Sequence, residues 1–343
     1  MDQCDLSVII ASYNTKQLLQ ECLQSIYRNT QGITFEVIVV DDGSKDGSPE
    51  MVRQLFPAVR LICNERNLKY VGANNVGLRA AAGRYGLLLN SDVEVNPGAF
   101  ATLVRFMDKH PDAAAAGPKL LNPDGSIQHC IRSFAGVFPM ICQTLNLHKL
   151  WPNNPITNRY YRCNFNYDSV QVVPHIGTTA FIIRRQTWEM FGLLDERFEQ
   201  FFGDFSYCHM LGQHNQKIYY VPEAVVVHYG SQSINQSGIK QIRAQHKALL
   251  KFYSIYYSSR HSLPVRLLVR IGIRIREYFK VLEFHVSKEK RVITGPGAPP
   301  LSALQGQTVD HRAGCSAPVR PQSKIGAIRD SKRPALLKTT SRR

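Results

Sequence analysis

This chain of 343 residues lacks several features, and each absence excludes a class of protein. Its eight cysteines include no CxxC pair, so the sequence indicates neither a redox motif nor a thiolate zinc site. No apolar run is long enough to span a bilayer, and no basic segment precedes a long apolar stretch at the start. These absences, with several cysteines inside apolar patterns, predict a cytoplasmic protein with reduced thiols.

Two common glycine-rich phosphate loops are also missing. A dinucleotide-binding domain needs GxGxxG after its first strand, because only glycine lets the backbone approach the pyrophosphate. Residues 11–16 instead read Ala-Ser-Tyr-Asn-Thr-Lys, and no GKS or GKT occurs in the chain. The sequence therefore excludes these two modes of nucleotide binding.

Acidic residues are scarce beyond about Pro264, so the formal net charge of +16 is unevenly placed. Residues 264–285 mix Leu, Ile and Phe with arginines at helical spacing, which predicts a basic amphipathic helix. Residues 286–343 contain no aromatic residue and show no periodicity, which predicts a disordered basic tail. Peripheral contact of the helix with the inner face of a membrane and a solubilising role without a partner both stay open. Nucleic-acid binding, which would depend steeply on salt, is a weaker alternative.

What the chain does contain is a pair of apolar runs that each end in acidic residues. Residues 37–40 lead directly into Asp41 and Asp42, and residues 87–89 lead into Asn90 and, two positions later, Asp92. Short runs of Val, Ile and Leu without polar alternation are typical of strands buried on both faces of a parallel sheet. Ligands of such sheets bind outside the carboxyl ends of the strands, so the sequence predicts an acidic site for a nucleotide or a metal.

The first half alternates strands with helices, which predicts an α/β fold with a Rossmann-like, mostly parallel sheet flanked by helices. We expect residues 1–235 to form this domain, residues 236–285 to add C-terminal helices, and residues 286–343 to form the tail. The expected strands are 6–11, 35–40, 60–63 and 85–89, and the later helices are 48–56, 72–82 and 97–109. An aromatic and basic stretch at 126–170 suits either sugar binding or packing on the core.

The chain resembles the family 2 glycosyltransferases, and most closely their rhamnosyltransferase-like branch, over roughly residues 6–235. The motifs that carry the resemblance, in order, are Ser12-Tyr13-Asn14, Asp41-Asp42-Gly43-Ser44, the segment 67–77, Asn90-Ser91-Asp92, Gly117-Pro118 through Asn122-Pro123-Asp124-Gly125, Gly177-Thr178-Thr179-Ala180-Phe181, Asp195-Glu196-Arg197-Phe198 and His228-Tyr229-Gly230. The resemblance implies a GT-A fold and inversion at a sugar donated by a nucleotide diphosphate.

The resemblance also implies a divalent metal, Mg or Mn, which would neutralise charge on the leaving diphosphate. Asp92 matches the last acid of the family's DxD motif, and Asn90 stands where the first acid would be, at the nucleotide-sugar. His228 would be a further metal ligand. Without the resemblance, Asp92 is a turn or capping carboxylate and His228 a structural histidine.

Four further positions match the family's nucleotide-sugar contacts. By resemblance, Asp41 accepts the imide N–H of uracil or thymine, Tyr13 stacks on that base beside Ser12, and Asn74 faces the diphosphate. Asp41 could instead serve only a strand-end turn, Tyr13 could be a core phenol, and Asn74 a helix cap.

Asp204 matches the family's general base, which takes the proton from the acceptor hydroxyl. The chain departs from the family pattern here, because Gly203 replaces a glutamate and Ser206 replaces a later acid. Asp204 could otherwise be a helix N-cap.

The sequence thus predicts an inverting glycosyltransferase. It would move a sugar, rhamnose or similar, from a dTDP- or UDP-linked donor to a saccharide or lipid-linked glycan in surface polysaccharide synthesis. The alternative is a catalytically silent relative that binds a nucleotide-sugar or acts as a scaffold, motivated by Asn90, Gly203 and Ser206.

Overall fold

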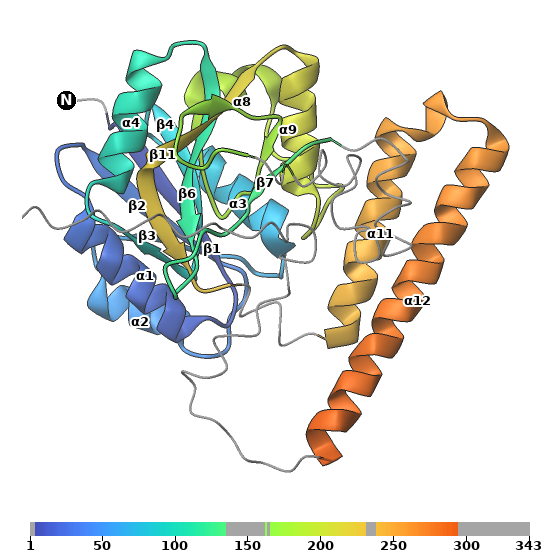
Figure 1. Cartoon of the computed structure of the whole chain (residues 1–343). Helices are drawn as coiled ribbons and strands as arrows, with labels where there is room; N and C mark the ends of the chain where they lie inside the picture. The colour runs from blue at the N-terminus through green and yellow to red at the C-terminus, as the bar shows by residue number, and fades with distance from the viewer. Residues whose placement is uncertain (1–3, 135–161, 163–164, 231–237, 294–343) are drawn as a thin grey trace, which may run out of the picture.

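The computed structural model describes residues 4–134, 162, 165–230 and 238–293, with the side chains of the last helix described as far as residue 285. Its first half is the expected alternation of parallel strands and helices (Figure 1). The parallel strands, in spatial order, are β3 (Arg60–Cys63), β2 (Phe35–Asp41), β1 (Leu6–Ser12) and β4 (Tyr85–Asn90).

Helices cover both faces of this sheet and form two apolar cores. One core contains α1 (Lys16–Asn29), α2 (Ser48–Leu55) and α4 (Ala99–Lys109), packed on Val8, Val37 and other residues of that face. The other contains α3 (Lys69–Ala80), α8 (Arg185–Phe191) and α9 (Gly203–Gln213). The central strands β1 and β4 and the second half of β2 are mainly apolar because both of their faces are buried, whereas β3 at the edge of the sheet is partly exposed.

The second half of the sheet is mixed rather than parallel. β10 (Ala180–Arg184) runs antiparallel to β4 and to β6 (Ala113–Leu121), and β11 (Lys217–His228) runs parallel to β6. β11 also pairs antiparallel with β5 (Val93–Val95) and with β8 (Gln171–Val172), while β7 (Ile131–Arg132) and β9 (His175–Ile176) form a separate small sheet. The regular strand-helix-strand alternation ends after α4, so nothing imposes parallel pairing beyond it.

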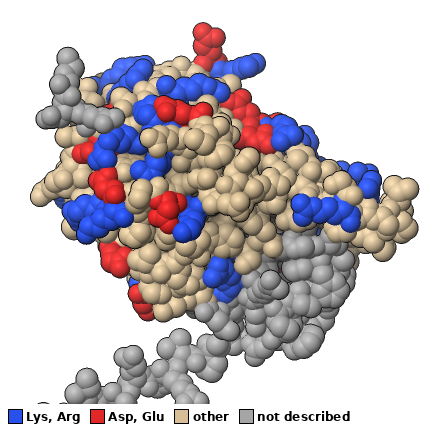
Figure 2. Space-filling view, turned by 90° about the horizontal axis from the view of Figure 1, so that it is seen from above, with Lys and Arg blue, Asp and Glu red and all other residues tan. Residues whose placement is uncertain are grey.

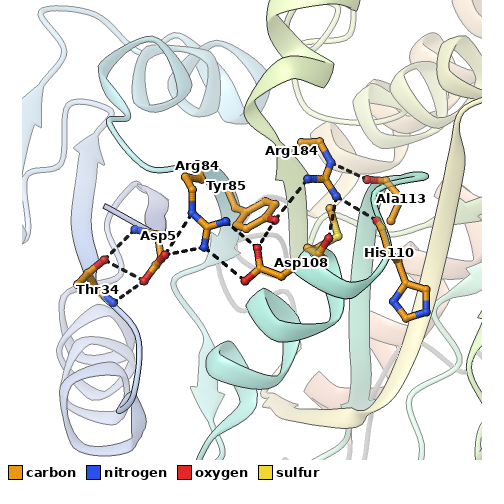
Figure 3. Close-up of polar contacts among 9 residues, drawn as sticks. Asp5, Thr34, Arg84, Tyr85, Asp108, His110, Ala113 and Arg184 are labelled. Carbon is orange, nitrogen blue, oxygen red and sulfur yellow. Dashed lines mark hydrogen bonds and ion pairs between the residues drawn. The ribbon is translucent and has the colours of Figure 1, made fainter. Parts of the chain in front are cut away.

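The sheet edge formed by the amino ends of the parallel strands carries a network of ion pairs (Figure 3). Arg84 contacts Asp5 at 2.7 Å and Asp108 at 2.6 Å, and the hydroxyl of Tyr85 donates to Asp108. The hydrogen bond from Arg84 lowers the pKa of the Asp108 carboxyl. These carboxylates stabilise the fold above their unfolded pKa, and the contribution is lost as the pH falls through the lowered value.

A long helical hairpin follows the sheet domain (Figure 1). It consists of α11 (Gly238–Tyr256), the short 3₁₀ helix η1 (Ser258–Arg260) and α12 (Leu263–Ile293). A third apolar cluster joins Tyr253 of α11 to Val269 and Ile273 of α12 and to Phe198 of the domain. The basic helix expected at 264–285 is therefore present, and its backbone continues past the expected boundary at 286.

Two expectations fall on other parts of the chain. The structure does not describe the tail beyond residue 293 or most of the aromatic stretch at 126–170. Within that stretch Tyr167 is described, and its ring packs in the core against Phe165 and Tyr220. Among the described helices, none combines the length and apolar character needed to cross a bilayer.

Candidate functional site

The carboxyl ends of β2, β1 and β4 lie side by side at the edge of the sheet opposite the Arg84 network. Ser12 pairs with Asp41 across the two strands, and Ala11 pairs with Asn90 on the other side of β1. Neighbouring strands are about 4.8 Å apart, so the ends of β2 and β4 stand about 10 Å apart. Three of the predicted site residues therefore share one edge.

Asp92 and His228, 136 positions apart along the sequence, lie in contact. His228 ends β11 and pairs with Val93 of β5, and the backbone N–H of Tyr229 donates to the carbonyl of Asp92. This ladder brings His228 Nε2 to 3.2 Å from Asp92 Oδ1, with both side chains buried. The antiparallel pairing of β5 with β11 creates this pair.

A chain of hydrogen bonds fixes which nitrogen of His228 carries the proton. The amide nitrogen of Gln128 donates to Asn122 Oδ1, so its oxygen is left to face His228 Nδ1, at 2.7 Å. An amide oxygen only accepts, so Nδ1 must donate, and in the neutral ring Nε2 keeps its lone pair. That lone pair then faces the Asp92 carboxylate, and no hydrogen-bond partner satisfies Nε2 among the described residues.

When the His228 ring is neutral, two acceptors face each other across this gap, so a cation bound there would be attracted to both. Asp92 Oδ1 and His228 Nε2 are 3.2 Å apart, close enough for the two residues to hold one divalent cation. In the part of the chain that the structure describes, no group of three or more His, Cys, Asp or Glu gathers that could hold a metal ion. A cation at this pair would thus take its other ligands from phosphate or water, as Mg²⁺ commonly does.

Asp41 combines a turn role with an unused acceptor. Its Oδ2 accepts the backbone N–H groups of Gly43 and Ser44, which is the strand-end turn that the sequence also suggested. Its Oδ1 is buried and has no hydrogen-bond partner in the described chain. Tyr13 is exposed rather than a core phenol, so its ring is available for stacking. The Ser12 hydroxyl is hydrogen-bonded to that of Thr15, and the Thr15 hydroxyl is hydrogen-bonded to that of Ser91. These buried hydrogen bonds connect the end of β1 to the turn after β4.

Tyr70 of α3 connects the strand end of β4 with the loop that precedes β10. Its hydroxyl lies 3.0 Å from Asn90 Oδ1 and 3.0 Å from the carbonyl of Thr178. Desolvation raises the pKa of Tyr70, and the charges of Asp204 and Asp92 raise it further, so both carboxylates act on this one hydroxyl. Tyr70 thus lies in the field of both carboxylates, while its hydrogen bonds go to Asn90 and Thr178.

Asn74 is fully buried one turn further along α3. Its Nδ2 donates to the carbonyl of Tyr70, and its Oδ1 lacks a hydrogen-bond partner among the described residues. Contact with a diphosphate would require its surroundings to move, so that role stays a prediction.

Asp204 lies in the first turn of α9 and is half-buried. The N-cap of this helix is Phe202, so the simple capping role for Asp204 is wrong. Its Oδ2 is 3.3 Å from His175 Nε2, and the His175 ring stacks on Phe205 with centroids 3.7 Å apart. The two contacts hold the carboxylate in one orientation while leaving it partly open to solvent.

The two departures from the family pattern beside Asp204 have structural partners. A Cβ at Gly203 would stand 2.5 Å from Cγ2 of Val71, so the close approach of α9 to α3 leaves no room for a glutamate as these helices lie. The hydroxyl of Ser206 is 2.7 Å from the hydroxyl of Tyr256 on α11. Both substitutions fit the packing of this chain and leave Asp204 in place.

Sequence reasoning missed Gln128, Tyr70 and His175, because each acts on a residue distant in sequence. Gln128 and Asn122 did carry a signal, since they lie in and just after the Asn-Pro-Asp-Gly motif. Asp42, in contrast, is structural: it accepts the backbone N–H groups of Leu68 and Lys69 and so anchors the start of α3.

Comparison with known proteins places this geometry in a family. The sequence profile described as Glycosyl transferase family 2 matches residues 7–166. The chain is 28% identical over 287 residues to an N-acetylglucosaminyl-diphospho-decaprenol L-rhamnosyltransferase of Mycobacterium tuberculosis, covering 80% of this chain and 92% of the relative. It is also 38% identical over 113 residues to the succinoglycan biosynthesis protein ExoO of Rhizobium meliloti, covering 33% of this chain and 31% of that protein.

Solved structures agree on the fold. A crystal structure of GalNAc-T7 with UDP, GalNAc and Mn²⁺ superposes with a TM-score of 0.54 at 18% identity, covering 75% of this chain and about half, 49%, of that chain. The mannosyltransferase PcManGT from Pyrobaculum calidifontis, in complex with GDP-Man and Mn²⁺, gives 0.50 at 17% identity, covering 87% of this chain and 77% of that one. The chain thus carries a family 2 glycosyltransferase domain that the profile matches over residues 7–166, has the GT-A fold, and is similar to a rhamnosyltransferase.

Proposed function

We propose that this protein is an inverting, metal-dependent glycosyltransferase that moves rhamnose or a similar sugar from a dTDP- or UDP-linked donor to a lipid-linked glycan. The observation that carries the proposal is the contact between Asp92 and His228, whose ring is oriented by Gln128, at the edge that also bears Asp41 and Asn90. The similarity to a rhamnosyltransferase whose name specifies a diphospho-decaprenol acceptor supports the choice of donor sugar and of acceptor class.

Each residue at this edge would contact a different part of the nucleotide-sugar donor. Asp41 Oδ1, buried and without a partner in the described chain, is an acceptor for the imide N–H of the base, and the exposed ring of Tyr13 stacks on it. Asn90 is oriented by the Tyr70 hydroxyl and lies between the base site and Asp92. A nucleoside diphosphate is long enough to span this row.

Asp92 and His228 are the residues that would hold the divalent metal. A bound divalent cation supplies Lewis acidity, which neutralises negative charge on the leaving phosphate. Structures with nucleotide, sugar and Mn²⁺ among the fold neighbours support a divalent metal in this chain.

Asp204 would accept the proton of the acceptor hydroxyl as that oxygen attacks the sugar. Its Oδ2 is oriented by His175, and its partial exposure leaves room for the acceptor to approach. In the described part of the chain no Lys or Arg is hydrogen-bonded to the Asp204 carboxylate, so no strong ion pair occupies its oxygens. His175 is a positioning residue in this scheme.

The direct test is a transfer assay on the purified chain with dTDP-rhamnose, UDP-sugars and a diphospho-polyprenyl N-acetylglucosamine acceptor. We expect product from one donor, complete loss in EDTA, and recovery with excess Mn²⁺ or Mg²⁺. A thermal-shift screen of the same donors would show stabilisation only with the metal. Absence of any product, with every donor and metal tested, would leave the silent nucleotide-sugar-binding relative as the better account.

Gln128 offers a test of how the site is held. In Gln128→Leu the oxygen that fixes Nδ1–H is lost, so His228 can turn or change tautomer, and we expect Mn²⁺ affinity to fall by about 10- to 100-fold. Calorimetric titration with Mn²⁺ measures this directly. Gln216→Leu, at a partly exposed glutamine just after α9, is the matched control and should bind Mn²⁺ as the parent does. Unchanged affinity in Gln128→Leu would mean that His228 is not a ligand.

A further inference from the structure

The outer helix of the hairpin, α12, presents an apolar face to solvent. Val269 and Ile273 point toward α11 and are buried. On the opposite side, at helical spacings of three and four, five large apolar residues are between 45% and 66% exposed: Leu267, Ile271, Ile275, Tyr278 and Leu282. Leu263, Leu268 and Phe279 flank them and are also exposed. We call these eight residues the α12 stripe.

This arrangement reverses the usual one, in which the outward face of a surface helix is polar. The described residues leave the stripe uncovered, and its eight side chains form a contiguous row along the helix. Contiguous exposed apolar patches mark sites of contact with another protein, a ligand or a membrane. We therefore expect another molecule or a membrane to cover the stripe.

The charge of the hairpin indicates which occupant fits. Residues 238–285 carry ten Lys and Arg against two Glu, and Arg270 and Arg274 are exposed along one border of the stripe. Seen from above, the sheet domain mixes acidic with basic side chains, whereas the right-hand end of the molecule shows Lys and Arg among uncharged residues (Figure 2). Arg274 pairs with Glu277 and Lys280 pairs with Glu283, yet the basic residues of the hairpin outnumber the acidic ones by ten to two. Two copies joined through the stripe would bring this excess of positive charge together, while an anionic lipid surface would neutralise it.

We propose that the α12 stripe docks the enzyme on an anionic lipid bilayer, with the apolar side chains inserted at the level of the headgroups. The inference rests on the proposed function in one respect, that a lipid-linked acceptor gives docking a purpose. An amphipathic helix lying in the plane of the interface needs an apolar face with basic residues at its borders, and α12 has both. The helix lies on the membrane and does not cross it.

The hairpin also connects the docking surface to the catalytic base. Phe252 of α11 contacts Phe202 and Phe205, the residues on either side of the Gly203–Asp204 turn, with ring centroids 5.4 Å and 6.2 Å apart. The Tyr256 hydroxyl lies 2.7 Å from that of Ser206. Since α11 packs on α12 along its length, docking α12 fixes where Asp204 stands relative to the bilayer. This is the geometry that a membrane-bound acceptor requires.

The test is flotation of the full chain with vesicles of phosphatidylcholine, with and without phosphatidylglycerol, and without any acceptor. We expect binding to the anionic vesicles and a fall of at least about tenfold in the partition coefficient when three stripe residues become serine. The variant is Leu267→Ser, Ile271→Ser and Ile275→Ser. The control, with three equally exposed apolar residues of the sheet domain, is Leu55→Ser, Val172→Ser and Met190→Ser.

A charge variant separates lipid attraction from simple hydrophobicity. Arg270→Gln with Arg274→Gln should weaken binding about fivefold per arginine on vesicles with phosphatidylglycerol and have little effect on neutral ones. Arg105→Gln with Lys109→Gln, exposed on α4, serves as its control. Equal loss on both vesicle types would contradict attraction to anionic lipid.

Two outcomes would overturn the docking proposal. The serine variant could float as well as the parent, in which case another segment binds the vesicles. Alternatively, the parent could be a dimer that the serine changes convert to a monomer, with neither form binding vesicles; the stripe would then be an interface between copies. Transfer to a short-chain, water-soluble acceptor should be equal in parent and serine variant, so a failure of docking is distinguishable from a failure of the enzymatic proposal.

Discussion

Asp204→Asn is expected to lower kcat for sugar transfer by about 10²- to 10⁴-fold, because an amide cannot take the proton of the attacking hydroxyl. The side chain keeps its size, and His175 Nε2 can still donate to the amide oxygen in place of Oδ2. Donor and metal should therefore bind as in the parent. Rapid-quench measurement of a single turnover, with the donor and acceptor saturating, isolates this chemical step.

The matched control is Asp168→Asn, a largely exposed carboxylate that pairs with Lys119 on the sheet domain. It should leave kcat unchanged. The acid side of the pH–rate profile gives a second readout, since protonation of the base removes activity in the parent and Asp204→Asn should lack that dependence in its residual rate. If Asp204→Asn keeps most of the parent's single-turnover rate, another group is the base and the role given to Asp204 is wrong.

The same variant distinguishes the enzyme from a silent nucleotide-sugar-binding relative. In a silent relative, Asp204→Asn would change neither turnover nor donor binding, because there is no turnover to lose. The structure gives packing reasons for two of the residues that suggested a catalytically silent relative. Gly203 is explained by its contact with Val71, and Ser206 by its hydrogen bond with Tyr256, so neither change needs a loss of function as its cause.

The sequence predicted the first half of the fold well because the signals there are local. Residues 37–40 and 87–89 form strands in which both faces are buried, and each helix that follows has a continuous apolar face. The second half could not be predicted in the same way, since β10 enters antiparallel between β4 and β6. That placement depends on contacts between segments far apart in the chain, and short strands carry no local sign of their partners.

For the candidate site, too, the residues with local sequence signals could be predicted and those that depend on long-range contacts could not. Asp41, Asn90 and Asp92 could be predicted because they follow strands whose ends must share an edge. The contact of His228 with Asp92 needed the resemblance to a family, since its cause is the pairing of β5 with β11. The roles of Gln128 and His175 escaped prediction because their partners, His228 and Asp204, are distant in sequence.

Asp92→Asn is expected to reduce Mn²⁺ binding and, with it, to lower transfer by about 10²- to 10³-fold at limiting metal, since the several kcal/mol that a cation contributes to the leaving phosphate would be lost. The neutral amide is a weaker ligand than the carboxylate, so part of the activity should return at high Mn²⁺. Calorimetry or electron paramagnetic resonance of bound Mn²⁺ checks the affinity independently of activity. Asp112→Asn is the control, because that carboxylate pairs with Lys217 at the far end of the strand that carries His228.

The stability of the metal-free protein decides whether Asp92 serves a ligand or only the fold. In the metal-free parent the Asp92 carboxylate faces the lone pair of His228 Nε2 at 3.2 Å, an arrangement without a shared proton when the ring is neutral. In Asp92→Asn the new amide N–H can donate to that nitrogen and satisfy it, so the melting temperature without metal should stay the same or rise. Mn²⁺ should then stabilise the parent and have little effect on the variant. A large drop in the metal-free melting temperature, with Mn²⁺ affinity intact, would instead make the carboxylate a structural partner of His228 and leave the cation to be bound elsewhere.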